Sequence, residues 1–130
     1  MSQADLPETM LTTLFRAVAD LSFDAITVTR ASESSGPEIV YVNDAFTQLT
    51  GYPTGEVIGE TPGILQGPHT DSDVLKRLDE MVARGEPFHG QTINYRKDGS
   101  PFEMEWKVMR LGEADGATYY VAVQREAEAR

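Results

Sequence analysis

The stretch IVYVNDAFTQLTGYPTGEVIGE, residues 39–60, holds the signals that decide the fold. Its apolar, β-branched start predicts a short strand over residues 38–42. Asn43 or Asp44 is then placed to cap a short helix, because short polar side chains accept hydrogen bonds from the free amides of a first turn. Gly51 is placed to end that helix, since glycine readily adopts the left-handed conformation found after many helices. The stretch therefore predicts a strand that leads directly into a capped helix.

Upstream of this stretch the pattern predicts one strand and one helix. Residues 23–30 alternate apolar and polar side chains as a half-buried strand does, and residues 31–37 are predicted to form a loop. Residues 7–20 carry apolar side chains at helical spacing. This helix lies outside the predicted core, so we expect it either to cap the core or to join a dimer. Its apolar residues are Met10, Leu11, Leu14, Val18 and Leu21.

Downstream, an irregular segment precedes the strongest helix of the chain. Residues 53–69 hold three prolines and four glycines, which leave room only for single helical turns. Residues 71–84 are predicted to be a helix with Thr70 or Asp71 as its cap and Gly85 as its end. One apolar stripe runs along this helix and is formed by Val74, Leu75, Leu78, Met81 and Val82.

The last third of the chain is predicted to be three strands joined by tight turns. Asp-Gly pairs mark hairpins at residues 97–100 and 115–116, and they separate strands over residues 88–96, 101–111 and 117–125. Together with the elements before them, these strands make an α+β domain. The apolar face of the middle strand is formed by Phe102, Met104, Trp106 and Val108.

The composition is that of an ordinary globular domain with an acidic surface. A length of 130 residues suits one domain. The absence of cysteine excludes disulfides, thiolate zinc ligands and thiol nucleophiles. A net charge of -10 repels phosphate backbones, so no nucleic-acid binding is expected. No apolar run reaches the length of a membrane span and the N-terminus lacks a signal-peptide pattern, so we expect no membrane partner and a cytoplasmic location.

Separate blocks of the sequence, in order, resemble the signatures of a PAS domain. Residues 39–60 resemble the opening PAS signature, and VAVQRE, residues 121–126, is similar to the usual last strand. ILQGPHTD, residues 64–71, and NYRKDGSPF, residues 94–102, resemble the LOV subgroup of flavin-binding blue-light sensors. The resemblance implies a PAS fold, in which a five-stranded antiparallel sheet with helices on one face encloses a small-molecule pocket. The implied parts are an N-terminal helical extension over residues 1–21, a PAS/LOV-like domain over residues 22–126 and a C-terminal tail over residues 127–130.

The resemblance also bears on the chemistry of the pocket. In a LOV domain the pocket holds FMN or FAD, and blue light joins a cysteine sulfur to the flavin ring. The position of that cysteine is matched here by Pro62. Proline has no nucleophile, so the adduct is chemically excluded. If flavin is bound, we expect signalling by photoreduction or redox change without a cysteinyl adduct.

Several residues are implied to meet a flavin. The ring-edge positions of the family match Gln66, Asn94 and Gln124, and a carboxamide suits a polar ring edge because it offers both a donor and an acceptor. From the residues alone, Gln66 can equally cap a helix or tie a loop, and Asn94 can equally pair with backbone. Trp106 matches a phenylalanine beside the ring and is also interpreted as core. The other expected pocket residues are Thr29, Leu65 and Leu78, with Leu75 and Val82 as further apolar walls.

Other positions depart from the LOV pattern. Arginines that commonly hold the FMN phosphate are matched by Gly63 and Asp79, and Asp79 would repel a phosphate if it faced one. Cations remain on neighbouring turns at Lys76, Arg77 and Arg84. Further pocket positions also differ and carry Thr61, Met104 and Ala122.

More than one class of function remains open. The first is a sensory signal-input domain that binds flavin without forming an adduct. The second is a flavin-free PAS domain that acts as a dimerisation or protein-interaction module, or that senses another small ligand; His69 and His89 are poorly placed as haem ligands. No enzyme activity, catalytic residue or metal site is predicted.

We expect a homodimer through the N-terminal helix and the sheet face, with an effector domain or protein as a further partner. That sheet face carries Tyr119, Val121 and Val123.

Overall fold

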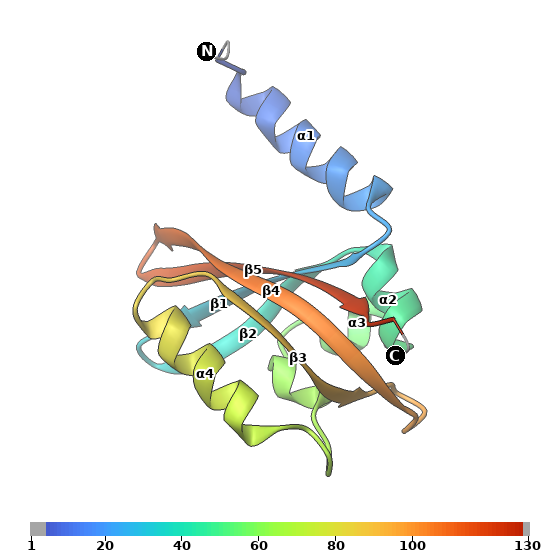
Figure 1. The fold of residues 1–130 in the computed structure, drawn as a ribbon. Coiled ribbons are helices and arrows are strands. Elements are labelled where there is room, and N and C mark those ends of the chain that lie inside the picture. The colour runs from blue at the N-terminus through green and yellow to red at the C-terminus, as the bar shows by residue number, and fades with distance from the viewer. Residues whose placement is uncertain (1–4, 129–130) are drawn as a thin grey trace.

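The chain folds into a five-stranded antiparallel sheet with helices on one face, which confirms the predicted α+β architecture (Figure 1). The computed structural model describes residues 5–128, so parts of the predicted extension (1–4) and tail (129–130) lie outside the described residues. Within the described range, no helix combines the length and apolar character that crossing a bilayer requires. In chain order the elements are α1 (Glu8–Leu21), β1 (Ala25–Ser32), β2 (Ser35–Val42), α2 (Asp44–Thr50), α3 (Thr54–Val57), the 3-10 helix η1 (Pro62–Leu65), α4 (Ser72–Ala83), β3 (Phe88–Tyr95), β4 (Pro101–Ala114) and β5 (Ala117–Glu126).

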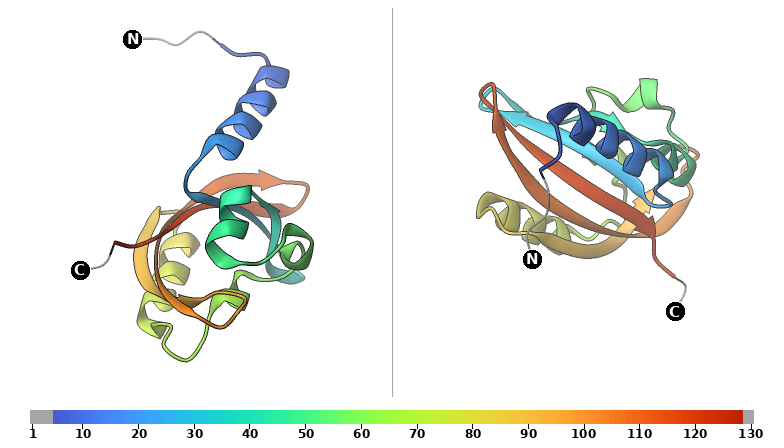
Figure 2. Two further views of the ribbon diagram at one scale, coloured as in Figure 1. Left: turned by 90° about the vertical axis from the view of Figure 1, so that its right-hand side faces the viewer. Right: turned by 90° about the horizontal axis from the view of Figure 1, so that it is seen from above.

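The strand order places the first and last strands of the chain side by side. It runs β2-β1-β5-β4-β3, so β1 and β5 are both interior strands. Helices α2, α3 and α4 lie with η1 on one face of the sheet, and α1 rises on the opposite side (Figures 1 and 2). The first and last strands, β1 and β5, are thus paired along their length in the interior of the sheet.

Side-chain caps set where the helices begin. Asn43 Oδ1 accepts a hydrogen bond from the amide of Phe46 at 3.1 Å, which starts α2. Asp71 Oδ1 accepts from the amide of Asp73 at 2.9 Å, which starts α4. Gly51 follows α2 with a φ of 79°, a conformation that strains any residue with a Cβ atom. Of the caps that the sequence left open, Asn43 and Asp71 are therefore the ones used.

The segment 31–37, predicted to be a loop, is largely strand. β1 runs to Ser32 and β2 starts at Ser35, and these two residues pair across a tight turn. Because β1 also pairs with β5 as far as Ser32, the backbone ladder holds the segment although its side chains show no apolar alternation. Pro37 is tolerated because β2 is an edge strand, where one side of the backbone needs no partner. The prediction was wrong because the side-chain pattern does not report backbone pairing.

The core lies between the inner face of the sheet and the helices. Along β4 the apolar face expected from the alternation is buried, and Phe102, Met104 and Trp106 are each at most 6% exposed. The apolar stripe of α4 is only half-buried, and no residue of that helix is fully buried. Helix α4 therefore does not close tightly on the sheet, and it leaves a cavity beneath it. Other buried apolar residues of the core are Ala25, Ile39, Val42, Phe46, Val57, Leu65 and Phe88.

Helix α1 does not cap the core within one chain, which corrects the first of the two expectations for the N-terminal helix. It rises from the domain with its apolar side chains exposed (Figures 1 and 2). Its last turn is tied to the core, where Asn43 Nδ2 donates to the carbonyl of Ala19 at 2.9 Å, and this tie directs the helix outward. Its other anchor is the Phe15 ring, which lies 5.4 Å from the Tyr41 ring between centroids. An amphipathic helix gains most of its stability from packing its apolar face, so this face needs a further partner.

Candidate functional site

A cavity of about 270 Å³ lies between α4, η1 and the inner face of the sheet. Its volume is near the lower limit of small-molecule sites, about 300 Å³. Side chains of β1, β3, β4 and β5 form its floor, and side chains of η1 and α4 form its roof. The structure brings all the pocket residues expected from the sequence to this one cavity, namely Thr29, Leu65, Gln66, Leu78, Asn94, Trp106 and Gln124.

Gln124 is buried at the floor of the cavity and is only half satisfied by polar partners. Its Oε1 accepts a hydrogen bond of 2.6 Å from Thr27 Oγ1, which joins β5 to β1. Its Nε2 lies 4.0 Å from the sulfur of Met104, its only partner among the described residues. A thioether is a weak acceptor, so this amide nitrogen can donate to a stronger one.

Asn94, on β3, faces the same sulfur from the other side. In one orientation its Nδ2 lies 3.5 Å from Met104 Sδ. The opposite orientation is better satisfied, because the nitrogen then donates to the carbonyl of Ile93 at 3.1 Å and to that of Leu65 at 3.3 Å. The amide oxygen of Asn94 is then turned toward Met104. The Asn94 oxygen on β3, an acceptor, and the Gln124 nitrogen on β5, a donor, therefore lie on either side of the Met104 sulfur at the floor of the cavity.

The three carboxamides predicted to line the pocket differ in burial. Asn94 and Gln124 are each 5% exposed, whereas Gln66 is exposed. Gln66 lines the cavity beside Pro37 and Asp79, which are also exposed, so these residues mark its mouth. The backbone amide of Gln66 donates to the carbonyl of Gly63 at 3.0 Å and ends η1.

The walls of the cavity are apolar. Leu65 of η1 and the half-buried stripe of α4 face Trp106 and Val108 of β4. Trp106 also contacts the core, where its ring lies 5.1 Å from that of Phe88 between centroids. It is thus both core and cavity wall. The α4 residues in this wall are Leu75, Leu78 and Val82.

Some lining residues were not expected from the sequence. Thr27 and Ala31 line the cavity with Thr29, because alternate residues of β1 share one face. The period-two pattern around Thr29 could have identified both. Pro37 carried no comparable signal, because it reaches the cavity only through the hairpin of β1 and β2.

Some of the residues that differ from the LOV pattern line the cavity, and others do not. Pro62, Asp79, Met104 and Ala122 line it, whereas Thr61 and Gly63 do not. Pro62 thus presents a saturated ring where the resemblance places a thiol. Asp79 is exposed and lines the cavity, so its carboxylate lies among the lining residues and not on a distant surface.

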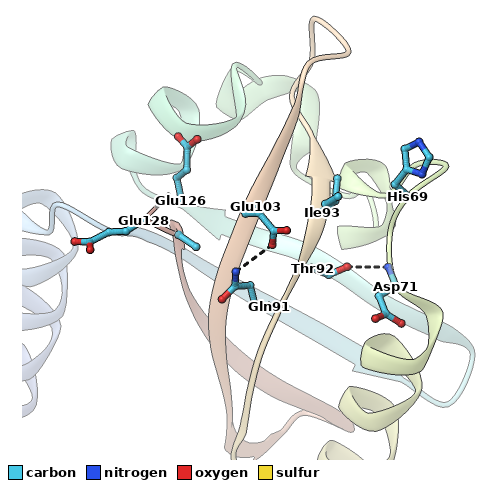
Figure 3. Close-up of a pocket in the computed structure, with 9 residues that line it drawn as sticks. His69, Asp71, Gln91, Thr92, Ile93, Glu103, Glu126 and Glu128 are labelled. Carbon is cyan, nitrogen blue, oxygen red and sulfur yellow. Dashed lines mark hydrogen bonds between the residues drawn. The ribbon is translucent and has the colours of Figure 1, made fainter. Parts of the chain in front are cut away.

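A larger hollow of about 690 Å³ lies outside this cavity and is open and acidic (Figure 3). It is lined by Asp71, Glu103, Glu126 and Glu128 among others, with His69 at its edge. In the described part of the chain, no cluster of three or more His, Asp or Glu side chains is arranged to hold a metal ion. We therefore take the enclosed cavity, with its buried amides, as the candidate site.

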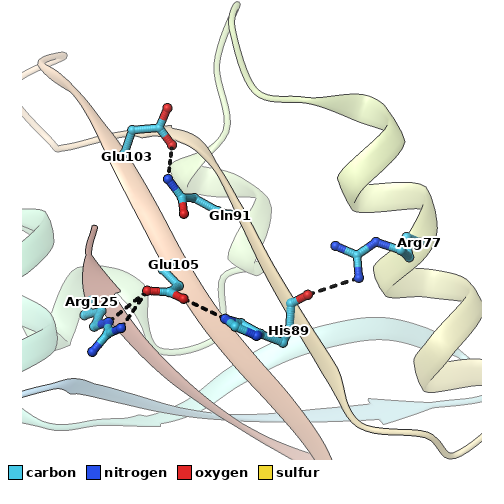
Figure 4. A network of polar contacts seen from close by, with 6 residues as sticks. All are labelled: Arg77, His89, Gln91, Glu103, Glu105 and Arg125. Atoms are coloured by element: carbon cyan, nitrogen blue, oxygen red, sulfur yellow. Dashed lines mark hydrogen bonds and ion pairs between the residues drawn. The ribbon is translucent and has the colours of Figure 1, made fainter. Parts of the chain in front are cut away.

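The outer face of β3, β4 and β5 carries a chain of polar contacts (Figure 4). Glu105 lies 2.7 Å from His89 Nε2 and 2.8 Å from Arg125 Nη2. The hydrogen bond from His89, followed by that from Arg125, lowers the pKa of the Glu105 carboxyl. These contacts tie three strands together on the face away from the cavity, and neither His89 nor His69 lines the cavity.

The chain is similar to LOV domains in sequence and in structure. Residues 15–127 match the PAS fold family. The chain is 41% identical over 98 residues to Protein TWIN LOV 1 of Arabidopsis thaliana, which covers 71% of this chain and 24% of that protein. It is 40% identical over 78 residues to Blue-light-activated histidine kinase 1 of Erythrobacter litoralis, which covers 60% of this chain and 21% of that protein. A solved structure described as "Flavin Analogue Sheds Light on Light-Oxygen-Voltage Domain Mechanism" matches with a TM-score of 0.74 at 30% identity, covering 92% of this chain and 85% of that chain.

The family match covers the parts of the chain that build the site. It includes every strand from β1 to β5 and the whole roof of the cavity. The chain spans about a quarter or less of the length of the two sequence relatives, 24% and 21%. The chain belongs to the PAS fold family and is a sensory domain homologous to the LOV domains of blue-light receptors.

Proposed function

We propose that this domain senses its signal through a flavin held in the cavity and that it works without a cysteinyl adduct. The observation that supports the proposal most is the pair of buried carboxamides, Asn94 and Gln124, on either side of Met104. A flavin ring has an edge of carbonyls and ring nitrogens, which needs both donors and acceptors when buried. Asn94 offers an amide oxygen and Gln124 an amide nitrogen, so together they match such an edge.

The remaining lining suits the flat apolar body of the ring. Leu78 of the α4 roof and Trp106 of the β4 floor both line the cavity, so a flat apolar group bound there would contact side chains from both layers. A bound flavin supplies absorption of blue light and the capacity to accept electrons. Because Pro62 offers no nucleophile, the response must pass through hydrogen bonds and not through a new covalent bond.

Gln124 is the residue through which we expect the cavity to communicate with the sheet. Gln124 would hold the ring edge of a flavin through its amide, and the flavin would supply an edge atom that can be either an acceptor or a donor, according to its protonation. When the edge atom is a donor, the Gln124 amide has to turn so that its oxygen faces the ligand. Its nitrogen then faces Thr27 Oγ1, in place of the oxygen that accepts from that hydroxyl at 2.6 Å. Turning the amide therefore alters the tie between β5 and β1, the central strands beneath the outer face.

Flavin uptake is the direct test of this proposal. Protein purified without added cofactor, and then refolded with riboflavin and with FMN, is expected to take up at least one of them and to show a blue absorption band. Uptake is measured by absorption after gel filtration, with flavin fluorescence as a second reading. Colourless protein that retains neither flavin would contradict the proposal and would leave the flavin-free interaction module as the function.

We also propose that the domain forms a homodimer through α1 and the outer face of the sheet. Helix α1 rises on the side of the sheet that carries this face (Figure 1). On the outer face, Met109, Leu111 and Val123 are at least 40% exposed. A second copy of the chain would cover both surfaces at once. The apolar residues that α1 exposes are Met10, Leu11, Leu14, Phe15, Val18 and Leu21.

Two lysines on the apolar side of α1 are expected to dissociate this dimer. The variant Leu14→Lys/Val18→Lys removes apolar area and adds charge where the copies meet, so the dissociation constant should rise about 100-fold or more. Light scattering after gel filtration, over a range of concentrations, measures the change. Thr9→Lys/Thr12→Lys adds the same charge to the other side of the helix and should leave the dimer intact. A wild-type chain that stays monomeric at high concentration would refute the dimer.

The wider setting of the domain follows from its relatives. The kinase among them carries the matched segment within a longer chain, and the matched domain itself is a non-catalytic module. An effector domain or protein that responds to the dimer is therefore the expected partner. A cytoplasmic location remains a prediction from the sequence.

A further inference from the structure

We infer that the cavity selects a flavin that lacks a terminal phosphate, such as riboflavin, over FMN and FAD. The inference rests on the proposed flavin function and narrows its ligand class. Its basis is Asp79, an exposed acidic residue that lines the cavity.

The polarity of the cavity determines which end of a ligand reaches the mouth. The buried amides of Asn94 and Gln124 lie at the floor, so the polar ring edge is drawn inward. The exposed lining residues, Pro37, Gln66 and Asp79, mark where the cavity opens to solvent. The side chain of a bound flavin therefore leaves the cavity beside Asp79.

Among the residues that the structure describes, no lysine or arginine lines this cavity, and Asp79 is the only charged side chain that does so. The nearby arginines of the α4 region are engaged elsewhere. Arg77 donates to the carbonyl of His89 at 3.0 Å and lies 4.9 Å over the Phe88 ring. Arg84 contacts Met81 Sδ at 3.4 Å and lies 4.0 Å from Glu86. Lys76, also on α4, is exposed and does not line the cavity.

Two residues that line the cavity cannot donate a backbone hydrogen bond to a phosphate. Phosphates in proteins are held by cations or by free backbone amides. Pro37 and Pro62 line the cavity and have no amide hydrogen. A carboxylate next to a phosphate is repulsive, and this repulsion is only partly screened at the edge of a protein.

A ribityl chain without phosphate suits the same residues. It is uncharged and carries hydroxyl groups, which can donate to the Asp79 carboxylate. The exposed Gln66 amide can both donate to and accept from such hydroxyls. The mouth therefore stabilises a polyol chain and disfavours an anionic one.

Comparative binding of riboflavin and FMN to the full chain tests the inference. We expect riboflavin to bind at least about tenfold more tightly at low salt, measured by quenching of flavin fluorescence. The difference should shrink as ionic strength rises, because salt screens the repulsion felt by the phosphate.

Variants of α4 separate the role of Asp79 from the general charge of the helix. Asp79→Arg should reverse the preference in favour of FMN, and Asp79→Asn should reduce it. Glu80→Arg is the matched control, because it makes the same charge change at the next residue, which does not line the cavity. Circular dichroism and thermal melting establish whether each variant is folded. If Asp79→Arg does not fold, Asp79→Asn serves as the test variant.

The outcomes distinguish the inference from the function on which it rests. Equal or tighter binding of FMN by the wild type would overturn the inference and leave flavin binding intact. Binding of neither flavin would overturn the proposed function and the inference with it. An equal shift of preference in Glu80→Arg and Asp79→Arg would also overturn the inference, because the effect would then not depend on the mouth.

Discussion

Replacing Asn43 by alanine is expected to lower the free energy of unfolding by about 3 to 4 kcal/mol, because the change removes a cap and strands several buried polar groups. The Asn43 side chain is 3% exposed and uses its full hydrogen-bonding capacity. Its nitrogen donates to the carbonyls of Ala19 and Asp24 at 2.9 and 3.1 Å. Its oxygen accepts from the amides of Ile26 and Phe46 at 2.8 and 3.1 Å.

Urea unfolding of the variant and the wild type measures this loss. A typical small domain is stable by about 5 to 15 kcal/mol, so the variant should unfold at a much lower urea concentration. Gln48→Ala changes an exposed carboxamide on the same helix, α2, and should stay within about 0.5 kcal/mol of wild type. A loss below 1 kcal/mol in Asn43→Ala would show that Asn43 does not hold these segments together.

A smaller substitution separates the cap from the tie to α1. In Asn43→Ser the hydroxyl can still accept from the Phe46 amide, but it is too short to reach the carbonyls of Ala19 and Asp24. We expect an intermediate loss of stability, with faster amide hydrogen exchange concentrated in the last turn of α1. Equal exchange in α1 of the variant and the wild type would indicate that other contacts direct this helix.

Replacing Gln124 by leucine is expected to weaken flavin binding by about tenfold to a hundredfold. Leucine has a similar size but offers no donor, so part of the buried ring edge is left without a partner. The double variant Asn94→Leu/Gln124→Leu should retain no flavin through gel filtration, because the floor then holds neither carboxamide. Titration by fluorescence quenching gives the affinities of the single variants.

Controls separate the loss of the amide from a change in the sheet. Gln91→Leu makes the same replacement on the outer face of β3, where Gln91 bonds to Glu103 at 3.1 Å, and should not change affinity. Thr27→Val removes the 2.6 Å bond to Gln124 but keeps the amide, so binding should persist while the response to light weakens. Undiminished affinity in Gln124→Leu would place the ring edge elsewhere.

Much of the candidate site was accessible from the sequence, but its geometry was not. The matched family positions led to Asn94, Gln124 and Gln66, and all of them line one cavity. That Gln66 is exposed at the mouth while the others are buried depends on how η1 packs over the sheet. The amphipathic stripe of α4 was equally clear, but a stripe facing a solid core and one facing a cavity look the same in a sequence.

The features that could be predicted from the sequence are therefore those that depend on interactions between residues close together in the chain. The order of strands and helices, the place of each cap to within one residue and the exclusion of a cysteinyl adduct depend on residue identity and on neighbours a few positions away. The route of α1 and the place of Asp79 depend on groups far apart in the chain, because Asn43 reaches back to Ala19 and Asp79 meets a mouth built from β2 and η1. Burial and the charge around a ligand are properties of these distant neighbours, so only the tertiary structure decided them.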